Sequence, residues 1–298
     1  MMSTFLGMDI GASSIKFGWG NGNSLQHFSS IPIKSKNLDS FKQVAAAVLK
    51  TAEQTIGLKN ISAIGIGSPG TIDIGTGKIS GVNPNLPFWT DYNPAELIPS
   101  SLNVPVFCDN DANLMALAEA KHFGSRYALG ITVGSGIGSG IILDAKIYRG
   151  NNGFAGELGH VCMVQDGIVC SCGRKGCLEG YASVDGIRRR LAEDNADFAT
   201  MALSELLTRT DSNVHKHLAE GKAMLELAIV NIVTLLDIDI VIIGGGAMDA
   251  KMYNLESMKA EIELLLPVAN QGKVRIEQAF YGNQAGVIGA IRLAKQGL

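Results

Sequence analysis

A segment near the start of the chain is repeated further on with the same spacing of apolar and small residues. Residues 6–18 read LGMDIGASSIKFG and residues 129–141 read LGITVGSGIGSGI, so the offset is 123 residues. Each copy has an apolar run, a turn of small residues and a second apolar run, which is the pattern of a β-hairpin with a tight loop. Two such copies predict a duplicated α/β fold of two lobes, with the active cleft between them.

Apolar periodicity predicts the elements around these hairpins. Runs bounded by turn residues predict strands at Ile61–Gly67, Val104–Cys108, Asp239–Ile243 and Lys273–Glu277. Helical spacing predicts helices at Phe41–Ile56, Asn113–Phe123, Lys222–Leu236 and Ala285–Lys295. We expect a smaller N-terminal lobe at residues 1–118 and a larger C-terminal lobe at 119–282, with a C-terminal helix at about 283–298 packing back on the first lobe.

Charge and hydropathy exclude several classes of partner. The formal net charge is -3, and no basic run exceeds the three residues Arg188–Arg190, so nucleic acid is not an expected partner. No segment approaches the roughly 18 apolar residues that span a bilayer, and the opening residues lack a signal-peptide pattern. A cytoplasmic protein without a membrane partner is therefore expected.

The tip of the first hairpin carries Asp9, Gly11 and Ser13. Small residues in a turn let backbone N–H groups face an anion, and a carboxylate beside them is suited to hold Mg²⁺ through water. A plain hairpin turn accounts for the same residues, so this tip alone does not decide between a phosphate site and a turn.

The tip of the second hairpin carries Gly134, Ser135 and Gly136, and glycine continues at every second position to Gly140. Such a turn lets a phosphate approach the main chain closely. Its spacing fits neither the P-loop, which needs a following Lys and Ser or Thr, nor GxGxxG. A Walker-type kinase and a dinucleotide-binding Rossmann site are thereby disfavoured.

Gly244 and Gly245 directly follow the predicted strand that ends at Ile243. Glycines at the carboxyl end of a buried strand let a planar ligand lie against the main chain. A strand end followed by a flexible turn explains them equally well.

A polar cluster, Asp109-Asn110-Asp111-Ala-Asn113, lies between a predicted strand and a predicted helix. One carboxylate at a helix N terminus is an ordinary N-cap, but four polar groups in five residues exceed that need. An Asp that accepts the proton of a ligand hydroxyl, with an amide to orient the ligand, is what phosphoryl transfer to an alcohol requires.

One histidine and three cysteines, His160, Cys170, Cys172 and Cys177, lie within eighteen positions. They predict a tetrahedral Cys₃His site with no open position, hence a structural zinc ion and not a water-activating one. The alternative is four unrelated side chains. Glu157 precedes His160 by three residues and would share its face in a helix, while Glu179 follows the last cysteine by two. The metal would position both carboxylates for a polyhydroxy ligand.

Taken together, these motifs resemble the ROK family of repressors, uncharacterised reading frames and sugar kinases, within the hexokinase and actin-like ATPase superfamily. The resemblance covers nearly the whole chain. The segments that carry it are Asp9–Ser13, Ile66–Gly70, Asn85–Trp89, Asn110–Asn113, Val133–Gly138, Glu157–His160, Cys170–Glu179 and Gly244–Ala247.

The resemblance implies a role for each matching residue. Asp111 is implied as the general base. The implied sugar contacts are Gly70, Asn85, Asn110, Asp111, Glu157, His160 and Glu179. The implied ATP and Mg²⁺ contacts are Asp9, Gly11, Ser13, Gly134, Ser135, Gly136, Gly244 and Gly245. His160, Cys170, Cys172 and Cys177 would ligate Zn²⁺. The first loop departs from the family at Ala12-Ser13, where Gly-Thr is usual and a Lys often follows.

The resemblance therefore implies an ATP-dependent sugar kinase of carbohydrate metabolism, with glucose to glucose 6-phosphate, the entry to glycolysis, as the first expectation and a homodimer as the expected assembly. Kinases of N-acetylmannosamine, N-acetylglucosamine, fructose or allose share these motifs, and polyphosphate is an alternative donor. A sugar-responsive transcriptional regulator is disfavoured because eight residues before Asp9 leave no room for a helix-turn-helix. A binding module without catalysis would be expected to lose Asp111 or a phosphate loop.

Overall fold

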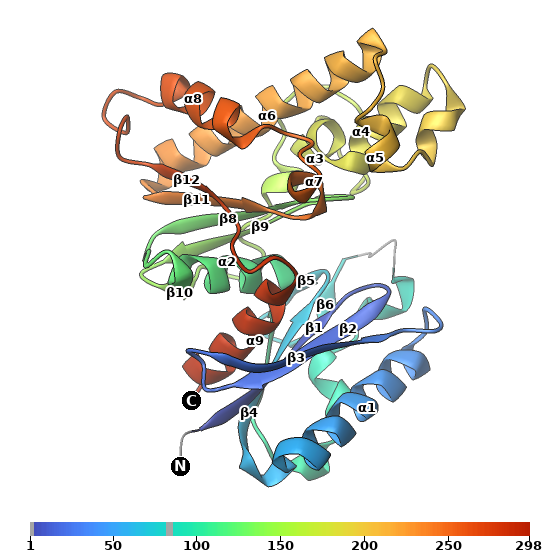
Figure 1. Cartoon of the computed structure of the whole chain (residues 1–298), viewed down its shortest axis with the longest axis vertical. Helices are drawn as coiled ribbons and strands as arrows, with labels where there is room; N and C mark the ends of the chain where they lie inside the picture. Colours follow the sequence, from blue (N-terminus) through green and yellow to red (C-terminus); the bar gives the residue numbers. More distant parts are fainter. Residues whose placement is uncertain (1–2, 82–85) are drawn as a thin grey trace. The chain divides into compact units, whose positions relative to one another are not determined.

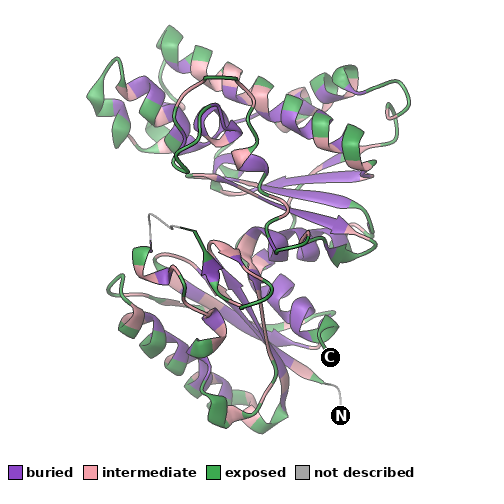
Figure 2. Cartoon of the chain, turned by 180° about the vertical axis from the view of Figure 1, so that it is seen from behind, coloured by how far each residue is buried: buried purple, intermediate pink, exposed green. Residues whose placement is uncertain are grey.

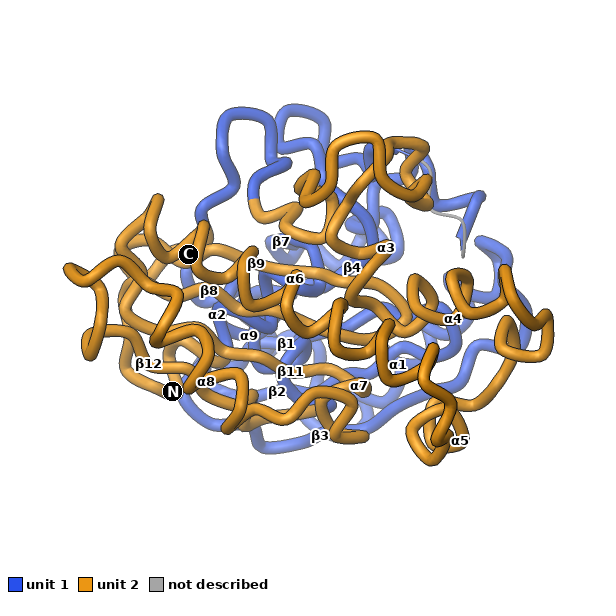
Figure 3. The backbone as a smooth tube through the Cα atoms, turned by 90° about the horizontal axis from the view of Figure 1, so that it is seen from above, with its two compact units in different colours: residues 1–118, 148–155, 283–298 blue, residues 119–147, 156–282 orange. Residues whose placement is uncertain are grey.

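The chain divides into two compact units, which Figure 3 shows in different colours. The computed structural model describes residues 3–81 and 86–298. Unit 1 comprises residues 1–118, 148–155 and 283–298, and unit 2 comprises 119–147 and 156–282. Residues 148–155, which the sequence analysis placed in the second lobe, belong instead to unit 1, where the Asn152 carbonyl accepts a hydrogen bond from the Ile74 N–H.

Unit 1 is built on a five-stranded sheet of order β3-β2-β1-β4-β7. The β1–β2 and β2–β3 pairs are antiparallel, whereas β1–β4 and β4–β7 are parallel. The elements of this unit are β1 Thr4–Ile10, β2 Ser14–Gly20, β3 Leu25–Pro32, α1 Leu38–Ile56, β4 Ile61–Ser68, β5 Thr71–Ile72, β6 Ile79–Ser80, β7 Val106–Asn110, the first part of α2 Asp111–His122, and α9 Ala285–Gln296.

Strand β1 sends alternate side chains to two different cores, as the pleat of a strand requires. Leu6 and Met8 join the cluster that includes the buried face of α1, while Phe5 packs with Val287 of α9. Asp9 has the parity of Phe5 and therefore lies on the α9 face. The α1 helix begins after Asn37, whose side chain accepts the Ser40 N–H.

Unit 2 is built on a second five-stranded sheet, of order β10-β9-β8-β11-β12. Its pairs repeat those of unit 1: β8–β9 and β9–β10 are antiparallel, and β8–β11 and β11–β12 are parallel. Its elements are β8 Ala128–Val133, β9 Ile137–Leu143, β10 Lys146–Ile147, α3 Leu178–Ala182, α4 Val184–Ala192, α5 Leu203–Leu206, α6 Ser212–Leu236, β11 Ile240–Gly244, α7 Gly246–Asp249, α8 Leu255–Leu265 and β12 Arg275–Gln278. The duplicated α/β fold is confirmed.

The core of unit 2 lies between its sheet and the helices α6 and α8, which run side by side in Figure 1. All five residues of β11 are buried, as expected of a central parallel strand covered on both faces. Figure 2 shows the same division throughout the described chain, with buried residues on the strands and exposed residues along the outer sides of the helices. No helix in the described residues is long and apolar enough to span a membrane.

Both predicted hairpins and all four further predicted strands are present, with bounds that differ by up to two residues. Helix α6 begins at Ser212, ten residues before its predicted start. Its first turns are mostly polar, although Val214 and Leu218 lie on the face that packs on the core. Strand β3 and helix α8 were not predicted. The mixed burial of β3 explains the first omission, since an edge strand lacks a continuous apolar run.

Candidate functional site

The polar cluster of unit 1 lies where β7 ends and α2 begins. Asn110 is the N-cap of α2, because its Oδ1 accepts the N–H groups of Ala112 at 2.9 Å and Asn113 at 3.3 Å. Its Nδ2 donates to the carbonyl oxygen of Gly70 at 3.1 Å. The cap is thus an amide and not one of the carboxylates, and the Asn110 side chain joins two of the predicted sugar-contacting segments.

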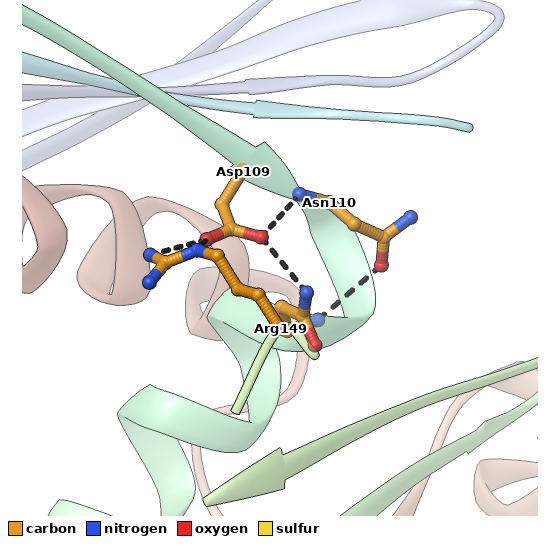
Figure 4. A network of polar contacts seen from close by, with 4 residues as sticks. Asp109, Asn110 and Arg149 are labelled. Carbon is orange, nitrogen blue, oxygen red and sulfur yellow. Dashed lines mark hydrogen bonds and ion pairs between the residues drawn. The ribbon is translucent and has the colours of Figure 1, made fainter. Parts of the chain in front are cut away.

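An ion pair between the buried Asp109 and the half-buried Arg149 supports this turn (Figure 4). Oδ2 of Asp109 lies 2.7 Å from Nε and 2.6 Å from Nη2 of Arg149. Oδ1 of the same carboxylate accepts the Asn110 N–H and the Nδ2 of Asn113, both at 2.8 Å. Asp109 is 3% exposed. Both of its carboxylate oxygens have hydrogen-bond partners in the protein, as buried polar atoms usually do. The sequence analysis missed Arg149 because forty residues separate the partners.

Asp111 is the first residue of α2 and is partly exposed. Its Oδ1 accepts the Ala112 N–H at 2.8 Å, and the N terminus of the helix favours a negative charge at this position. The amide of Asn113 is buried, and its Oδ1 has no hydrogen-bond partner among the described residues. Asn85, predicted to contact the sugar, lies outside the described residues.

The first hairpin tip uses part of its backbone for its own closure. Gly11 donates its N–H to the carbonyl oxygen of Ser14 at 2.9 Å, and the Ser13 carbonyl accepts the Ile33 N–H at 2.8 Å. The N–H groups of Ala12 and Ser13 have no partner among the described residues. These two N–H groups, and not that of Gly11, are available to an anion.

Asp9 faces Lys16 across the first hairpin, with Oδ2 3.5 Å from Nζ. Its carboxylate fills the space beside Gly286 of α9, where a methyl group would lie 2.5 Å from the carboxyl carbon. Burial raises the pKa of Asp9 above its usual value, and the charge of Lys16 opposes that rise. The sequence analysis missed Lys16, which lies opposite Asp9 because four residues, 11–14, separate the paired strand ends Ile10 and Ile15.

The second hairpin tip also uses its first glycine to close the turn, but with three residues between the paired strand ends where the first tip has four. Gly134 donates its N–H to the Gly136 carbonyl at 2.9 Å, and its own carbonyl accepts the Val184 N–H at the start of α4. The N–H groups of Ser135 and Gly136 have no partner among the described residues. Each tip therefore leaves two successive N–H groups for an anion, at positions related by the same offset of 123 residues.

Gly136 leaves space for a carboxylate that the sequence did not reveal. A methyl group there would lie 2.5 Å from Oε2 of Glu179, whereas at Gly134 it would meet nothing within 4 Å. The same Oε2 accepts the Ile137 N–H at 3.1 Å, and Oε1 accepts the Ser171 hydroxyl at 2.8 Å. The predicted phosphate turn and the predicted sugar-contacting Glu179 are thus in direct contact within unit 2.

Gly244 and Gly245 lie beside the second hairpin. Gly245 has a φ of 96°, and its Cα faces the backbone of Val133, so closely that a side chain would overlap it. Since Val133 directly precedes Gly134, the structure brings together two of the three predicted nucleotide-binding segments.

His160, Cys170, Cys172 and Cys177 come together in unit 2, with all potential ligand atoms within 4.8 Å of one another. Cys170 Sγ lies 3.7 Å from His160 Nδ1, and Cys172 Sγ lies 3.7 Å from Cys177 Sγ. Ligands at the corners of a tetrahedron around zinc are about 3.6 to 3.8 Å apart. The donor set and its spacing therefore fit a zinc ion.

The thiols of this cluster differ in their surroundings. Burial, with hydrogen bonds that the Cys177 thiol donates to Cys172 and Cys170, raises the pKa of Cys177 to about 12. A cation that binds here must displace this proton, so its affinity depends on pH. Glu157 is exposed and precedes the 3₁₀ turn Leu158–His160; it is not inside a helix, and its carbonyl accepts the His160 N–H at 3.0 Å.

Comparison with known sequences gives one family. The model of the ROK family matches residues 5–297. A glucokinase of Halalkalibacterium halodurans is 31% identical over 98% of this chain and 95% of its own length. An N-acetyl-D-glucosamine kinase of Photobacterium profundum is 28% identical over 96% and 97%. A xylose repressor of Caldicellulosiruptor bescii is 30% identical over 98% of this chain and 78% of its own.

Solved structures agree with that match. A ROK hexokinase from Thermus thermophilus has a TM-score of 0.83 at 26% identity and covers 99% of this chain and 98% of its own. A ROK family glucokinase from Streptomyces griseus, in complex with glucose and AMPPNP, has a TM-score of 0.78 at 26% identity and covers 99% and 100%.

Proposed function

Because this chain belongs to the ROK family, we propose that it is a sugar kinase that transfers a phosphoryl group from ATP to a hydroxyl of a hexose. Glucose is the first candidate, with N-acetylglucosamine, N-acetylmannosamine, fructose and allose as alternatives. The observation that carries the proposal is the turn at the start of α2, where Asp111 follows an Asn110 side chain fixed to Gly70 and supported by the Asp109–Arg149 ion pair.

Asp111 acts as the general base in this proposal. Its carboxylate accepts the proton of the attacking sugar hydroxyl, which leaves an oxygen able to attack the terminal phosphate. The helix that begins at Asp111 fixes the position of the carboxylate, and the Asn110 cap fixes the helix start. Asn110 retains one N–H for a ligand, because its other hydrogen bond goes to Gly70.

The sugar contacts of unit 2 are assigned to Glu157, His160 and Glu179. Carboxylates that accept hydrogen bonds from two neighbouring hydroxyls are common in the recognition of polyhydroxy ligands. Glu179 is held by the Ile137 N–H and by Ser171, so its orientation is fixed before a ligand binds. Fixed groups of this kind reduce the cost of ordering a ligand.

The nucleotide contacts are assigned to the two hairpin tips and to Gly244–Gly245. The paired N–H groups of Ala12 with Ser13, and of Ser135 with Gly136, are suited to phosphate oxygens. Asp9 would hold Mg²⁺ through water, and the ion would neutralise charge on the transferred phosphate. The glucokinase solved with AMPPNP supports ATP as the donor.

A structural zinc ion is assigned to His160, Cys170, Cys172 and Cys177. With four protein ligands it would have no position for a water molecule, and its contribution would be to fix the loop that joins His160 to Glu179. The chemistry remains with Asp111.

The proposal is tested by coupling ADP formation to a spectrophotometric readout with ATP and Mg²⁺ across glucose, mannose, fructose, allose, N-acetylglucosamine and N-acetylmannosamine. Sugar-dependent ADP release supports the kinase and identifies its acceptor. The same panel with polyphosphate examines the donor. Folded, zinc-replete protein that binds a sugar but produces neither ADP nor a sugar phosphate would contradict the kinase proposal and favour a binding or regulatory role.

A further inference from the structure

A fifth cysteine, Cys162, lies beside the predicted metal ligands without belonging to their set. It is exposed, whereas Cys177 is completely buried. Its Sγ lies 3.5 Å from the carbonyl oxygen of Val164. A methyl group at Gly176 would lie 3.1 Å from that Sγ, so the thiol is close to the residue that directly precedes Cys177.

Cys162 and Cys177 are directly opposite each other in an antiparallel bridge. The bridge is flanked by a hydrogen bond from the Met163 N–H to the Gly176 carbonyl at 2.7 Å and by one from the Leu178 N–H to the Val161 carbonyl at 3.0 Å. These bonds lie on either side of the pair, so Cys162 and Cys177 form a non-hydrogen-bonded pair. In such a pair the Cα atoms are about 4.5 Å apart and the side chains are close.

This register meets the backbone requirement of a disulfide, whose Cα atoms are usually about 4.4 to 6.8 Å apart. Residues directly opposite each other in an antiparallel pair also project from the same face. Rotation about χ1 of Cys162 would therefore bring its sulfur toward that of Cys177 without movement of the backbone.

We infer that Cys162 is a modification site, which a hydroperoxide oxidises to form a Cys162–Cys177 disulfide that removes Cys177 from the metal-binding set. The exposed thiol of Cys162 attacks the peroxide oxygen, gives a sulfenic acid and releases an alcohol or water. The Cys177 sulfur then attacks the sulfenic sulfur, the S–O bond breaks, and the oxygen leaves as water after protonation. Two thiols lose two electrons, and the peroxide gains them.

The disulfide would remove one of the four ligands from the metal site. Any bond from Cys177 to a zinc ion is lost, because zinc binds the thiolate and the disulfide sulfur is uncharged. The ion would then keep His160, Cys170 and Cys172 as ligands. Since Leu178 and Glu179 directly follow Cys177, the change would also reach the carboxylate that Gly136 accommodates, a consequence that rests on the proposed function.

The experiment measures zinc release from the zinc-loaded protein with a chromogenic chelator during treatment with hydrogen peroxide. We expect release from the wild type, reversal by dithiothreitol with added zinc, and at least a tenfold slower release from Cys162→Ser. Cys108→Ala is the matched control, because Cys108 lies on β7 in unit 1 and its removal leaves the bridge intact. Zinc content before oxidation should be equal in all three proteins.

Peptide mapping identifies the partner. Combined cleavage after Lys and Arg and before Asp places Cys162 on residues 150–165, Cys170 and Cys172 on 166–174, and Cys177 on 176–184. A crosslink between 150–165 and 176–184 is the expected product. The Cys172 and Cys177 sulfurs are also close, so a crosslink of 166–174 to 176–184 alone, or an unchanged release rate in Cys162→Ser, would overturn the inference. Both readouts are independent of kinase activity.

Discussion

The two sheets of this protein have the same order and the same strand directions, but their strand ends differ in chemistry. In unit 1, β1 ends near Asp9, and β7 ends at Asp109 and Asn110. In unit 2, the equivalent of Asp9 is Thr132, and β12, which has the place of β7 in the strand order, ends at Glu277 and Gln278. The side chains of Asp9 and Asp109 are 14% and 5% exposed, whereas that of Glu277 is 38% exposed, so unit 1 buries carboxylates at its strand ends and unit 2 leaves its carboxylate exposed.

The hairpin tips show what the duplication retained. Gly11 and Gly134 occupy equivalent positions, and each donates its N–H inside its own turn. The following two N–H groups are left without a protein partner in both tips. The pair of available N–H groups is thus common to the two units, although four residues separate the paired strand ends in the first turn and three in the second. The buried carboxylates, in contrast, lie at the strand ends of unit 1. Four sets of substitutions examine that division, beginning with the largest expected effect.

Asp111→Asn should remove most turnover, because the amide cannot accept the proton of the sugar hydroxyl. Loss of a general base lowers kcat by about 10² to 10⁴-fold, while sugar affinity, measured by calorimetry, should change little. Asp39→Asn is the control, since Asp39 is likewise an aspartate in the first turn of a helix. Near-normal kcat in Asp111→Asn would show that Asp111 is not the general base.

Arg149→Ala tests whether the strand ends of unit 1 need their ion pair. The substitution removes the ionic partner of the buried Asp109 carboxylate. Because the Arg149 side chain is itself 35% exposed, we expect a cost below the roughly 3 to 5 kcal/mol of breaking a fully buried pair. We expect a lower midpoint of urea unfolding and a lower kcat, because Asp109 orients Asn110 and Asn113.

Arg126→Ala provides the comparison for that variant. Its ion pair with Asp144 has both side chains more than half exposed, and such pairs contribute about 0 to 1 kcal/mol. Arg149→Lys should recover part of the stability, since it restores the charge but offers one nitrogen in place of the two that contact Asp109. Equal effects of Arg149→Ala and Arg126→Ala would contradict the role given to the Asp109–Arg149 pair.

Gly136→Ala and Gly134→Ala separate two reasons for glycine in the second tip. The methyl group at 136 would push Glu179 away, so we expect a KM for the sugar raised by about tenfold, the scale of one lost hydrogen bond to a charged group. At 134 the methyl group meets no protein atom, so any effect should appear in the KM for ATP. The same change in both constants for both variants would remove the distinction between the positions.

The sequence predicted elements better than contacts, for a physical reason. The hairpins and central strands are continuous apolar runs beside turn residues. This signal lies entirely within a short stretch of sequence, so it can be recognised without knowledge of the fold. The Asp109–Arg149 pair and the fit of Glu179 against Gly136 join residues about forty apart, and spacing carries no trace of them. Gly136 was interpreted as space for a phosphate, whereas the structure places a carboxylate there.

The metal cluster and the N-cap of α2 were both predicted from residues close together in the sequence. One histidine and three cysteines within eighteen positions predicted a metal site, and the structure brings the four residues together. The N-cap of α2 was expected to be a carboxylate, yet Asn110 caps it because an amide oxygen accepts the two N–H groups while its Nδ2 reaches Gly70. The sequence identifies several residues that can cap the helix, but the hydrogen bond to Gly70 favours Asn110 over the adjacent aspartates.

The smallest expected effect concerns the cost of placing Asp9 at a buried strand end. Burial raises the pKa of this carboxyl in the folded protein, so the stability linked to its proton is fully present below the unfolded value of about 3.8 and is lost as pH rises through the folded value. Asp9→Asn should therefore be more stable than the wild type at pH 7.5, by on the order of 1 kcal/mol, the usual scale of a point substitution.

That gain in stability should shrink as pH falls toward 4, because the wild-type carboxyl then becomes increasingly protonated and, like the Asn amide, uncharged. Urea unfolding of both proteins across this range measures the difference, and Lys16→Met is the matched variant: without the ammonium group that favours the charged carboxylate, the pH dependence should become steeper. An Asp9→Asn protein that is more stable but slower in phosphoryl transfer would mean that unit 1 keeps a destabilising carboxylate for its chemistry, where unit 2 has Thr132. Equal stability of Asp9→Asn and wild type at every pH would mean that burial imposes no such cost.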